Sequence, residues 1–296
     1  MKFEKVILKN QNNFVLKDTF ECGQCFRWKR EIDGSYTGVV SVGVLNVSKR
    51  GQDIEIKGYI NDDADFKSFC DDYFDLKKDY NKIQNEISKD DKVMKEAIRF
   101  GNGIRILNQN SWEMLISYII SAANNIPRIS KCIYNISRRY GKKVVLSDDI
   151  KHQLFNFESE ENTFYLFPTP NELIKGNEVE LRECNLGFRD KYVYGATKLV
   201  SSKEVILEDV EKHDYKSAKK ILTQIAGVGD KVADCILLFS MHKSEAFPVD
   251  TWIKKIMNEV YVDSKNVKKI NEYAYAKWGV NSGIAQQYLF YYKRES

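Results

Sequence analysis

The sequence predicts an α+β fold, in which an N-terminal antiparallel β-sheet domain is followed by a larger all-helical part. From residue 1 to about 60, apolar and polar residues alternate between turn signals, a pattern typical of strands with one wet face. After Lys89 the apolar residues recur every three or four positions, which is typical of amphipathic helices. With 296 residues, the chain is long enough to bury one or two cores.

Two turns mark the β-rich part. Asp33-Gly34 separates two strand-like runs and is a strong hairpin signal. A second turn at Arg50-Gly51-Gln52 precedes the alternating residues Ile54-Glu55-Ile56. Residues 62–75 hold six aspartates among aromatic side chains. A solvated helix-and-loop segment explains them better than a calcium site, because no loop glycine and terminal glutamate arrange the acids around an ion.

The helical part is predicted from the periodic spacing of its apolar residues. Asn110 and Glu113 form a capping-box-like start for a helix whose apolar residues share one buried face. Further helices are predicted at 127–139, 189–202, 215–225, 230–241, 251–261 and 282–293. We expect three units: residues 1–85 as the β-rich domain, residues 86–120 with 245–296 as one helical lobe, and residues 121–244 as a second lobe.

Composition limits the function. No apolar run is long enough to span a bilayer, and the first residues do not resemble a secretory signal. The net charge of +4 permits a nucleic-acid partner, but only through a local concentration of donors. The six cysteines are interpreted as reduced thiols. Cys22 and Cys25 have CxxC spacing, yet no second pair or close histidine completes a zinc site, and no cysteine follows Cys235 to build an iron–sulfur cluster.

The segment from Ile221 to Asp234 carries the main functional signal. Two apolar-faced helices are joined by a turn with Gly227 and Gly229, whose backbone N–H groups suit a phosphate oxygen. A plain helical hairpin that ends in a glycine cap has the same local pattern. Lys231 lies in the first turn of the second helix, where the positive end of the helix dipole disfavours its ammonium form. Since an amine must be neutral to attack, Lys231 is a candidate nucleophile; an exposed lysine that contacts phosphate is the alternative.

A carboxylate follows in Pro248-Val249-Asp250-Thr251. Asp250 is well placed to cap the helix that starts at Thr251, and capping alone is its simplest role. The hairpin and this acid together resemble the helix–hairpin–helix DNA glycosylases, which carry a catalytic aspartate beyond the same hairpin. We therefore expect Asp250 both to cap the helix and to act in catalysis.

The resemblance is to the 8-oxoguanine DNA glycosylase/AP lyase family of the eukaryotic type. Gly227–Cys235, followed by Pro248–Asp250, is similar to the catalytic segment of that family. Four further segments resemble its motifs in the expected order, namely Gly23–Trp28, Ser121–Ile129, Gly187–Tyr192 and Ala285–Phe290. The resemblance implies a two-lobed all-helical helix–hairpin–helix glycosylase core behind the sheet domain.

The family implies a bifunctional enzyme that excises 8-oxoguanine from double-stranded DNA. Lys231 would attack C1′ of the damaged nucleotide and expel the base, and the resulting Schiff base would permit β-elimination of the 3′ phosphate. Asp250 would stabilise the cationic character of the sugar. The family further implies that no cofactor is required, that the protein is a monomer without a membrane partner, and that it is cytoplasmic, with the nucleoid in a prokaryote, or nuclear in a eukaryote.

The matching motifs imply the base pocket. The Gly23 carbonyl would accept a hydrogen bond from N7–H, a proton that 8-oxoguanine has and guanine lacks. Gln286 would contact the Watson–Crick edge. Phe290 and Cys235 would sandwich the flipped base, which must leave the stack to react.

The same motifs imply a DNA-binding surface. Phe188 would wedge into the duplex, while Arg128 and Arg189 would bond to the unpaired cytosine on the opposite strand. The other implied DNA contacts are Asn124, Asn125, Gly227, Gly229 and Trp252. Backbone carbonyls would hold a structural monovalent or calcium ion at the hairpin, and they belong to Thr223, Ile225 and Val228.

Two positions depart from the family pattern. Ala123 replaces the first of three asparagines, so one polar contact to the opposite cytosine is lost and a relaxed opposite-base preference is expected. Trp252 stands where a phosphate-contacting histidine is common. A glycosylase for another damaged base and a non-catalytic DNA-binding scaffold remain the alternatives, although Lys231 and Gly23 favour oxidised guanine.

Overall fold

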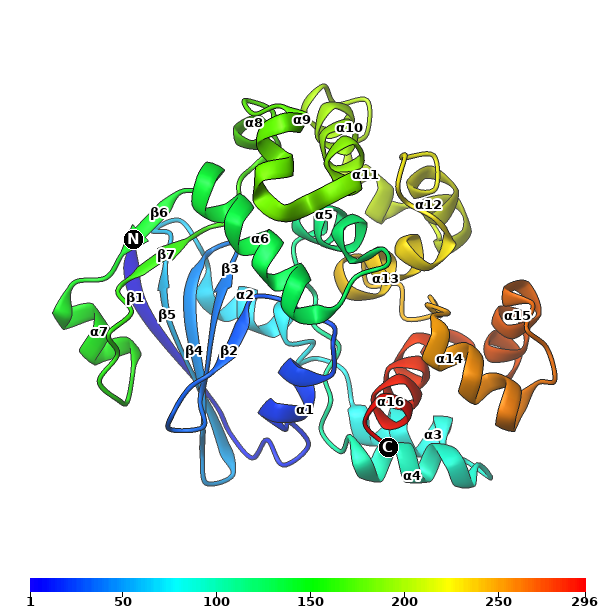
Figure 1. The fold of residues 1–296 in the computed structure, drawn as a ribbon. Coiled ribbons are helices and arrows are strands. Elements are labelled where there is room, and N and C mark those ends of the chain that lie inside the picture. The colour runs from blue at the N-terminus through cyan, green and yellow to red at the C-terminus, as the bar shows by residue number, and fades with distance from the viewer.

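The computed structural model describes residues 1–296 and begins with a five-stranded antiparallel sheet. The strand order is β1-β5-β4-β3-β2, and the sheet lies beside the helical part of the molecule (Figure 1). The strands are β1 (Lys2–Leu8), β2 (Trp28–Arg30), β3 (Tyr36–Val40), β4 (Gly43–Arg50) and β5 (Asp53–Ile60). Both predicted turns are confirmed, because Arg30 pairs with Tyr36 across the first and Arg50 with Asp53 across the second.

Sixteen α-helices follow or interrupt the sheet, so the predicted α+β class is confirmed. They are α1 (Leu16–Glu21), α2 (Phe66–Tyr73), α3 (Tyr80–Ile87), α4 (Lys92–Phe100), α5 (Ser111–Ser121), α6 (Ile126–Tyr140), α7 (Asp148–Leu154), α8 (Pro170–Leu173), α9 (Glu178–Leu181), α10 (Asp190–Ser201), α11 (Leu207–Lys212), α12 (Tyr215–Leu222), α13 (Asp230–Ser240), α14 (Thr251–Ile256), α15 (Val267–Trp278) and α16 (Ser282–Glu295). Short π-helical turns cover Arg182–Leu186 and Met257–Tyr261, and 3₁₀ turns cover Gly187–Arg189 and Gly279–Asn281.

Helix α5 starts at the predicted cap, but only half of the expected capping box forms. The Asn110 side chain accepts a hydrogen bond from the backbone N–H of Glu113 at 3.0 Å. The Glu113 carboxylate does not accept the reciprocal hydrogen bond from the backbone N–H of Asn110. It is buried and pairs with Arg27 at 3.5 Å, so it joins α5 to the N-terminal part instead.

The hydrophobic core does not follow the three expected units. A single cluster of 54 buried residues runs through both expected helical lobes, and it includes α3, which lies across the expected boundary at residue 85. A smaller cluster of 16 residues fills the space between the sheet, α1 and α2.

The expectation that residues 121–244 are wholly helical is wrong for one segment. Residues Lys143–Val145 form β6 and Thr163–Tyr165 form β7, which pair as a separate two-stranded sheet. Together with α7 they pack on the first sheet, where Val44 joins a third hydrophobic cluster with Val144 and Leu154 (Figure 1). This segment therefore belongs structurally to the β-rich part.

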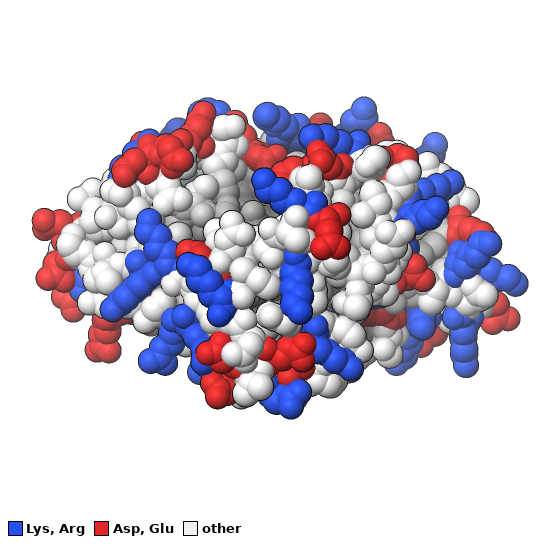
Figure 2. All heavy atoms as spheres, turned by 90° about the horizontal axis from the view of Figure 1, so that it is seen from above, with Lys and Arg blue, Asp and Glu red and all other residues white.

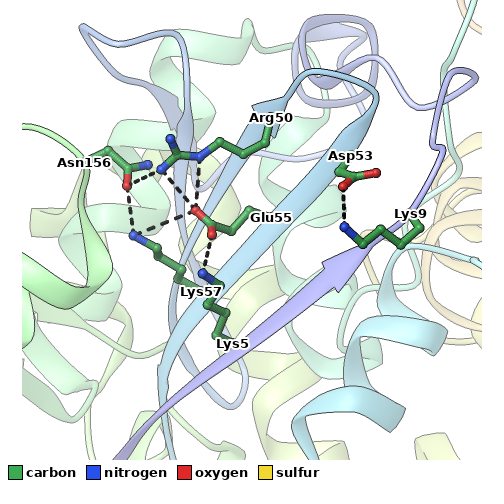
Figure 3. Close-up of polar contacts among 7 residues, drawn as sticks. All are labelled: Lys5, Lys9, Arg50, Asp53, Glu55, Lys57 and Asn156. Carbon is green, nitrogen blue, oxygen red and sulfur yellow. Dashed lines mark hydrogen bonds and ion pairs between the residues drawn. The ribbon is translucent and has the colours of Figure 1, made fainter.

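An ion cluster around the buried Glu55 and Lys57 joins this segment to the sheet (Figure 3). Glu55 is 6% exposed and pairs with Lys5 at 2.5 Å and with Arg50 at 3.3 Å. The Asn156 side chain accepts hydrogen bonds from Arg50 at 2.8 Å and from Lys57 at 2.9 Å. Burial raises the pKa of the Glu55 carboxyl, but the bond from Lys5 and the neighbouring positive charges outweigh it, so the net pKa is lowered. The carboxylate thus stays charged at neutral pH and compensates the buried Lys57.

Candidate active site

The predicted helix–hairpin–helix is present as α12 and α13. Gly227 has φ +91°, and a Cβ there would lie 2.8 Å from Cβ of Tyr192, so both conformation and space require glycine. Gly229 differs, because its φ of −91° suits any residue and nothing lies within 4 Å of an added Cβ. Its missing side chain leaves open surface at the start of α13, where a DNA backbone can approach closely.

A buried carboxylate braces the two hairpin helices. Asp234 on α13 is 1% exposed. It accepts hydrogen bonds from the Tyr215 hydroxyl and from the Lys219 ammonium, both on α12 and both at 2.8 Å. Burial raises the pKa of Asp234 to about 6, against the lowering effect of Lys219 and Tyr215. The brace fixes the turn that carries Gly227 and Gly229.

Tyr215→Phe should weaken this brace. We expect the free energy of unfolding to fall by about 2 kcal/mol, because the buried Asp234 loses one hydrogen bond to a group that carries charge. Urea denaturation of the two proteins measures the difference. Tyr192→Phe is the matched control, since the Tyr192 hydroxyl makes no hydrogen bond within the chain, and equal midpoints for all three proteins would contradict the proposed brace.

One cavity brings the predicted catalytic and base-binding residues together. It has a volume of about 60 Å³ and is lined by Gly23, Tyr118, Lys231, Cys235, Phe239, Pro248, Asp250, Gln286, Gln287 and Phe290. These residues come from four distant parts of the chain. The fold therefore brings Lys231 and Asp250 together with the four residues expected to contact the base.

The two candidate catalytic groups are placed by helix starts. Lys231 lies in the first turn of α13, and its Nζ is 5.4 Å from the ring centroid of Tyr118. Asp250 caps α14, where its Oδ1 accepts a hydrogen bond from Ile253 N–H at 2.8 Å. Burial raises the pKa of Asp250, and the bond from Ile253 and the charge of Lys231 offset this only in part. The acid and the amine thus interact electrostatically within the cavity.

The sulfur that lines the cavity is not a second nucleophile. Cys235 is 3% exposed, and burial raises the pKa of its thiol to about 11 despite the positive charge of Lys231. At neutral pH the thiol is uncharged and weakly reactive. Cys235 therefore supplies a soft apolar wall, as expected for a residue that packs on a base.

Gln286 presents an unused acceptor to the cavity. The side chain is 4% exposed, and its Oε1 is buried without a hydrogen-bond partner. An unpaired buried acceptor costs free energy unless a ligand supplies a donor. The neighbouring Gln287 is committed to structure, since it donates to the Cys22 carbonyl at 2.9 Å.

Gly23 reaches the cavity in a left-handed conformation with φ +91°. A Cβ at this position would lie 3.3 Å from Cε1 of Phe290, so a side chain would crowd the pocket. The next residue, Gln24, fixes the turn through bonds to the carbonyls of Thr19 at 2.9 Å and Arg105 at 2.7 Å. The Gly23 carbonyl is thereby held by a rigid backbone.

The predicted wedge and the hairpin share one groove. Phe188 is 56% exposed on a 3₁₀ turn, which is unusual for a large apolar side chain. The groove is lined by Phe188, Arg189 and the hairpin residues 223–229. A ring exposed beside an open hairpin turn fits insertion into a duplex held by that turn.

Arg189 makes its hydrogen bonds inside the protein. Arg189 is 3% exposed, and its guanidinium donates to the carbonyl of Ala122 from Nε at 2.8 Å and from Nη2 at 2.5 Å. It also donates to the carbonyls of Ala123 at 2.9 Å and Leu186 at 3.2 Å. These donors bond within the protein, so Arg189 orders the loop before α6, and a contact with the opposite cytosine would require some of these bonds to be exchanged.

The other predicted DNA contacts lie at the surface or shape it. Arg128 is exposed, and Trp252 is 40% exposed at the start of α14. The Asn124 side chain donates to the Ile120 carbonyl at 3.0 Å, while Asn125 caps α6 through the backbone N–H of Arg128 at 3.0 Å. Both asparagines thus order the loop, and a direct contact with DNA remains a prediction for each.

Charge is distributed as the composition suggests. Figure 2 shows the face that is uppermost in Figure 1, where Lys and Arg side chains lie among Asp and Glu and around uncharged surface. This face has no uniformly basic surface, in keeping with the small net charge. All six cysteines are free and buried. No group of three or more His, Cys, Asp or Glu side chains is arranged to hold a metal ion. None of the helices has the length and apolar character to cross a bilayer.

Comparison with known proteins decides the family. Residues 6–115 match the family described as 8-oxoguanine DNA glycosylase, N-terminal domain. The solved structure of the Clostridium acetobutylicum 8-oxoguanine glycosylase/lyase, in complex with double-stranded DNA containing cytosine opposite 8-oxoguanine, is 42% identical, and the match covers 100% of this chain and 98% of that one with a TM-score of 0.88. This chain belongs to the 8-oxoguanine DNA glycosylase/lyase family.

More distant members of this glycosylase family match over almost the same length. The N-glycosylase/DNA lyase of Saccharomyces cerevisiae is 28% identical over a match that covers 98% of this chain and 85% of that protein. The N-glycosylase/DNA lyase OGG1 of Arabidopsis thaliana is 29% identical, with 92% and 75% covered. These relatives support an enzyme with glycosylase and lyase activity.

Sequence reasoning missed Tyr118 as a residue of the glycosylase pocket. The apolar face of α5 was correctly interpreted as core, and Tyr118 sits on the same helix among those residues with 3% of its surface exposed. Its ring nonetheless lines the cavity beside Lys231. Only the packing of α5 against α13 shows that a buried aromatic here faces the pocket.

Proposed function

We propose that this protein is a bifunctional DNA glycosylase and AP lyase that excises 8-oxoguanine from double-stranded DNA through a Schiff base on Lys231. The observation that carries the proposal is the cavity in which Lys231 and Asp250 meet the four expected base-binding residues. Membership of the 8-oxoguanine glycosylase/lyase family supports the same substrate.

The chemistry follows from an amine, an acid and a base pocket. The neutral amine of Lys231 attacks C1′ of the flipped nucleotide, and the C1′–N9 bond breaks as the base leaves with its electron pair and takes up a proton. The secondary amine then loses a proton and the sugar ring opens to a Schiff base. Loss of a C2′ proton expels the 3′ phosphate by β-elimination. Asp250 stabilises the positive charge that develops on the sugar.

Selectivity for the oxidised base rests on hydrogen-bond polarity. The Gly23 carbonyl accepts from N7–H of 8-oxoguanine, whereas guanine would present a lone pair to it. The unpaired Oε1 of Gln286 accepts from N–H groups of the Watson–Crick edge. Phe290 and Cys235 enclose the faces of the ring, and stacking on the aromatic side contributes about 1–3 kcal/mol.

Several surface groups are proposed to bind the duplex. Phe188 fills the space left by the flipped base, Arg128 and Trp252 contact the DNA at the surface, and the N–H groups of Gly227 and Gly229 bind phosphate. No cofactor is required for the reaction. The protein acts as a monomer wherever DNA is, which is the cytoplasm with the nucleoid in a prokaryote and the nucleus in a eukaryote.

The hairpin carbonyls fit a structural cation, either monovalent or calcium. The carbonyls of Thr223 and Val228 accept no hydrogen bond within the chain, and that of Ile225 accepts one, from Val228 N–H at 3.0 Å. Carbonyl oxygens with free lone pairs are suitable ligands for such ions. A cation held there would attract a DNA phosphate to the hairpin.

Ala123→Asn tests the proposed loss of opposite-base discrimination. Ala123 has φ +48°, a conformation that asparagine tolerates better than alanine, and the new amide adds donors at the exposed loop. We expect the ratio of excision rates opposite cytosine and adenine to rise about fivefold, as one added hydrogen bond of about 1 kcal/mol implies. Single-turnover assays on the two duplexes measure this ratio. Ala123→Gly relieves the same strained backbone conformation without adding a hydrogen-bond donor. If the ratio of excision rates rises equally in both variants, the added donor is not the cause of the discrimination.

Borohydride trapping tests the proposed function directly. The protein is incubated with an 8-oxoguanine duplex and sodium borohydride, which reduces a Schiff base to a stable protein–DNA adduct. An adduct with this duplex, and none with the undamaged duplex, supports the proposal. Salt-sensitive binding without any adduct would instead indicate a DNA-binding scaffold, and an adduct only with another damaged base would indicate a different glycosylase.

A further inference from the structure

We propose that Arg294 is a positioning residue that sets the selectivity of the base pocket. Arg294 lies in the last turn of α16, four residues after Phe290, so both side chains share one face of the helix. The inference rests on the proposed function, because Phe290 and Gly23 are the base-contacting groups through which Arg294 acts.

The Arg294 side chain spans from the helix to the turn before Gly23. Its Nη2 donates to the Glu21 carbonyl at 2.7 Å, and its Nε donates to the Glu295 carboxylate at 2.7 Å. The guanidinium carbon lies 5.3 Å from the ring centroid of Phe290. One planar cation therefore holds the Glu21–Gly23 turn and the Phe290 ring in a fixed relative position.

Arg294 also touches Gly23 itself. Its Nη1 lies 2.6 Å from the point that a Cβ at Gly23 would occupy, so the guanidinium packs directly against the Gly23 backbone. This Nη1 is buried and has no hydrogen-bond partner. An unpaired buried donor is unfavourable, so the stacking and the bonds at the other two nitrogens must outweigh it for the group to stay in place.

The guanidinium does not line the base cavity, although Phe290 and Gly23 both do. Arg294 therefore packs against Phe290 and Gly23 from outside the cavity and acts through these two residues. If it is removed, the Gly23 carbonyl and the Phe290 ring can shift relative to each other. A shift of this kind affects recognition of the base but not the approach of Lys231 to an abasic sugar, which has no base to place.

Arg294→Met tests the inference with two substrates. We expect single-turnover excision of 8-oxoguanine to fall about 10- to 100-fold, the effect of a small misplacement of binding groups. Cleavage of a preformed abasic site and the affinity for undamaged duplex should stay within about twofold, since neither uses the base pocket. Arg294→Lys, which can still donate to Glu21 but cannot stack a planar group, should recover part of the excision rate.

Lys293→Met is the matched control at the neighbouring position. Lys293 pairs with Glu259 at 2.7 Å and contacts neither pocket residue, so both reactions should remain within about twofold. Equal losses of excision and abasic-site cleavage in Arg294→Met, or no loss in either, would overturn the inference while the proposed function stands. If the unaltered protein excises no 8-oxoguanine, the proposed function itself is wrong and the inference falls with it.

Discussion

Replacing Lys231 with glutamine is expected to abolish the borohydride-trapped adduct and to lower excision of 8-oxoguanine by about 10⁴-fold or more. A glutamine amide is not a nucleophile at C1′, and loss of the covalent group leaves only binding and electrostatic effects. The fold should not suffer, because Lys231 is only partly buried. Trapping assays and single-turnover kinetics on an 8-oxoguanine duplex provide the two measurements.

The control for this substitution is Lys216→Gln. Lys216 is an exposed lysine on α12 of the same hairpin, and its ammonium does not line the cavity. The adduct must persist in this variant. An undiminished adduct in Lys231→Gln would show that another amine is the nucleophile and would remove the basis of the proposed mechanism.

Asp250→Asn is expected to reduce excision by about 10²- to 10³-fold, the usual cost of losing one preorganised electrostatic group at the reacting centre. Asparagine is as good a helix cap as aspartate, so the bond from Ile253 N–H and the stability of α14 should be preserved. Asp250→Ala separates the two roles, since it should lose both the activity and about 1 kcal/mol of unfolding free energy. Equal activity of Asp250→Asn and the unaltered protein would exclude a catalytic carboxylate.

The pH dependence of the excision rate should reflect the protonation of the Asp250 carboxyl. Because burial raises the pKa of Asp250, the carboxyl becomes protonated at a higher pH than a free aspartate does. The protonated form carries no negative charge, so the rate should decrease as the pH falls through this raised pKa. This acid limb should be missing from the pH–rate profile of Asp250→Asn, which can be measured at constant ionic strength.

Much of the fold could be predicted because the signals were local. The turns at Gly34 and Gly51 need positive φ, and both join the strands that flank them. The helices predicted from apolar periodicity at 127–139 and 282–293 occur as Ile126–Tyr140 and Ser282–Glu295. Where helices end was harder to predict: α12 stops at Leu222, before residue 225, because the chain turns there into the hairpin.

The segment 143–165 could not be predicted in the same way. Its two strands have three residues each, too few for period-two alternation to be recognised. Their apolar side chains pack with Val44 of the first sheet, about a hundred residues earlier. A local pattern contains no information about such a distant partner.

The candidate catalytic and base-contacting residues could be proposed from motifs, whereas Tyr118 and Phe239, which also line the cavity, could not. The motifs lie in the expected order along the chain, and the fold brings Gly23, Lys231, Cys235, Asp250, Gln286 and Phe290 together. The motif of Arg189 does not predict that its donors bond to the carbonyls of Ala122 and Ala123, and its contact with DNA stays a prediction. Arg294 carries no sequence signal at all, and only its position against Gly23 and Phe290 reveals it.

The base cavity combines Gly23, from an early part of the chain, with Gln286 and Phe290 from the last helix. Gln287 of that helix also bonds to the carbonyl of Cys22. During translation, Lys231 and Asp250 therefore leave the ribosome well before Gln286 and Phe290, two of the residues proposed to contact the base. The nascent polypeptide cannot select a lesion until α16 has been synthesised and has docked, so a chain interrupted before that point is left without a complete base pocket.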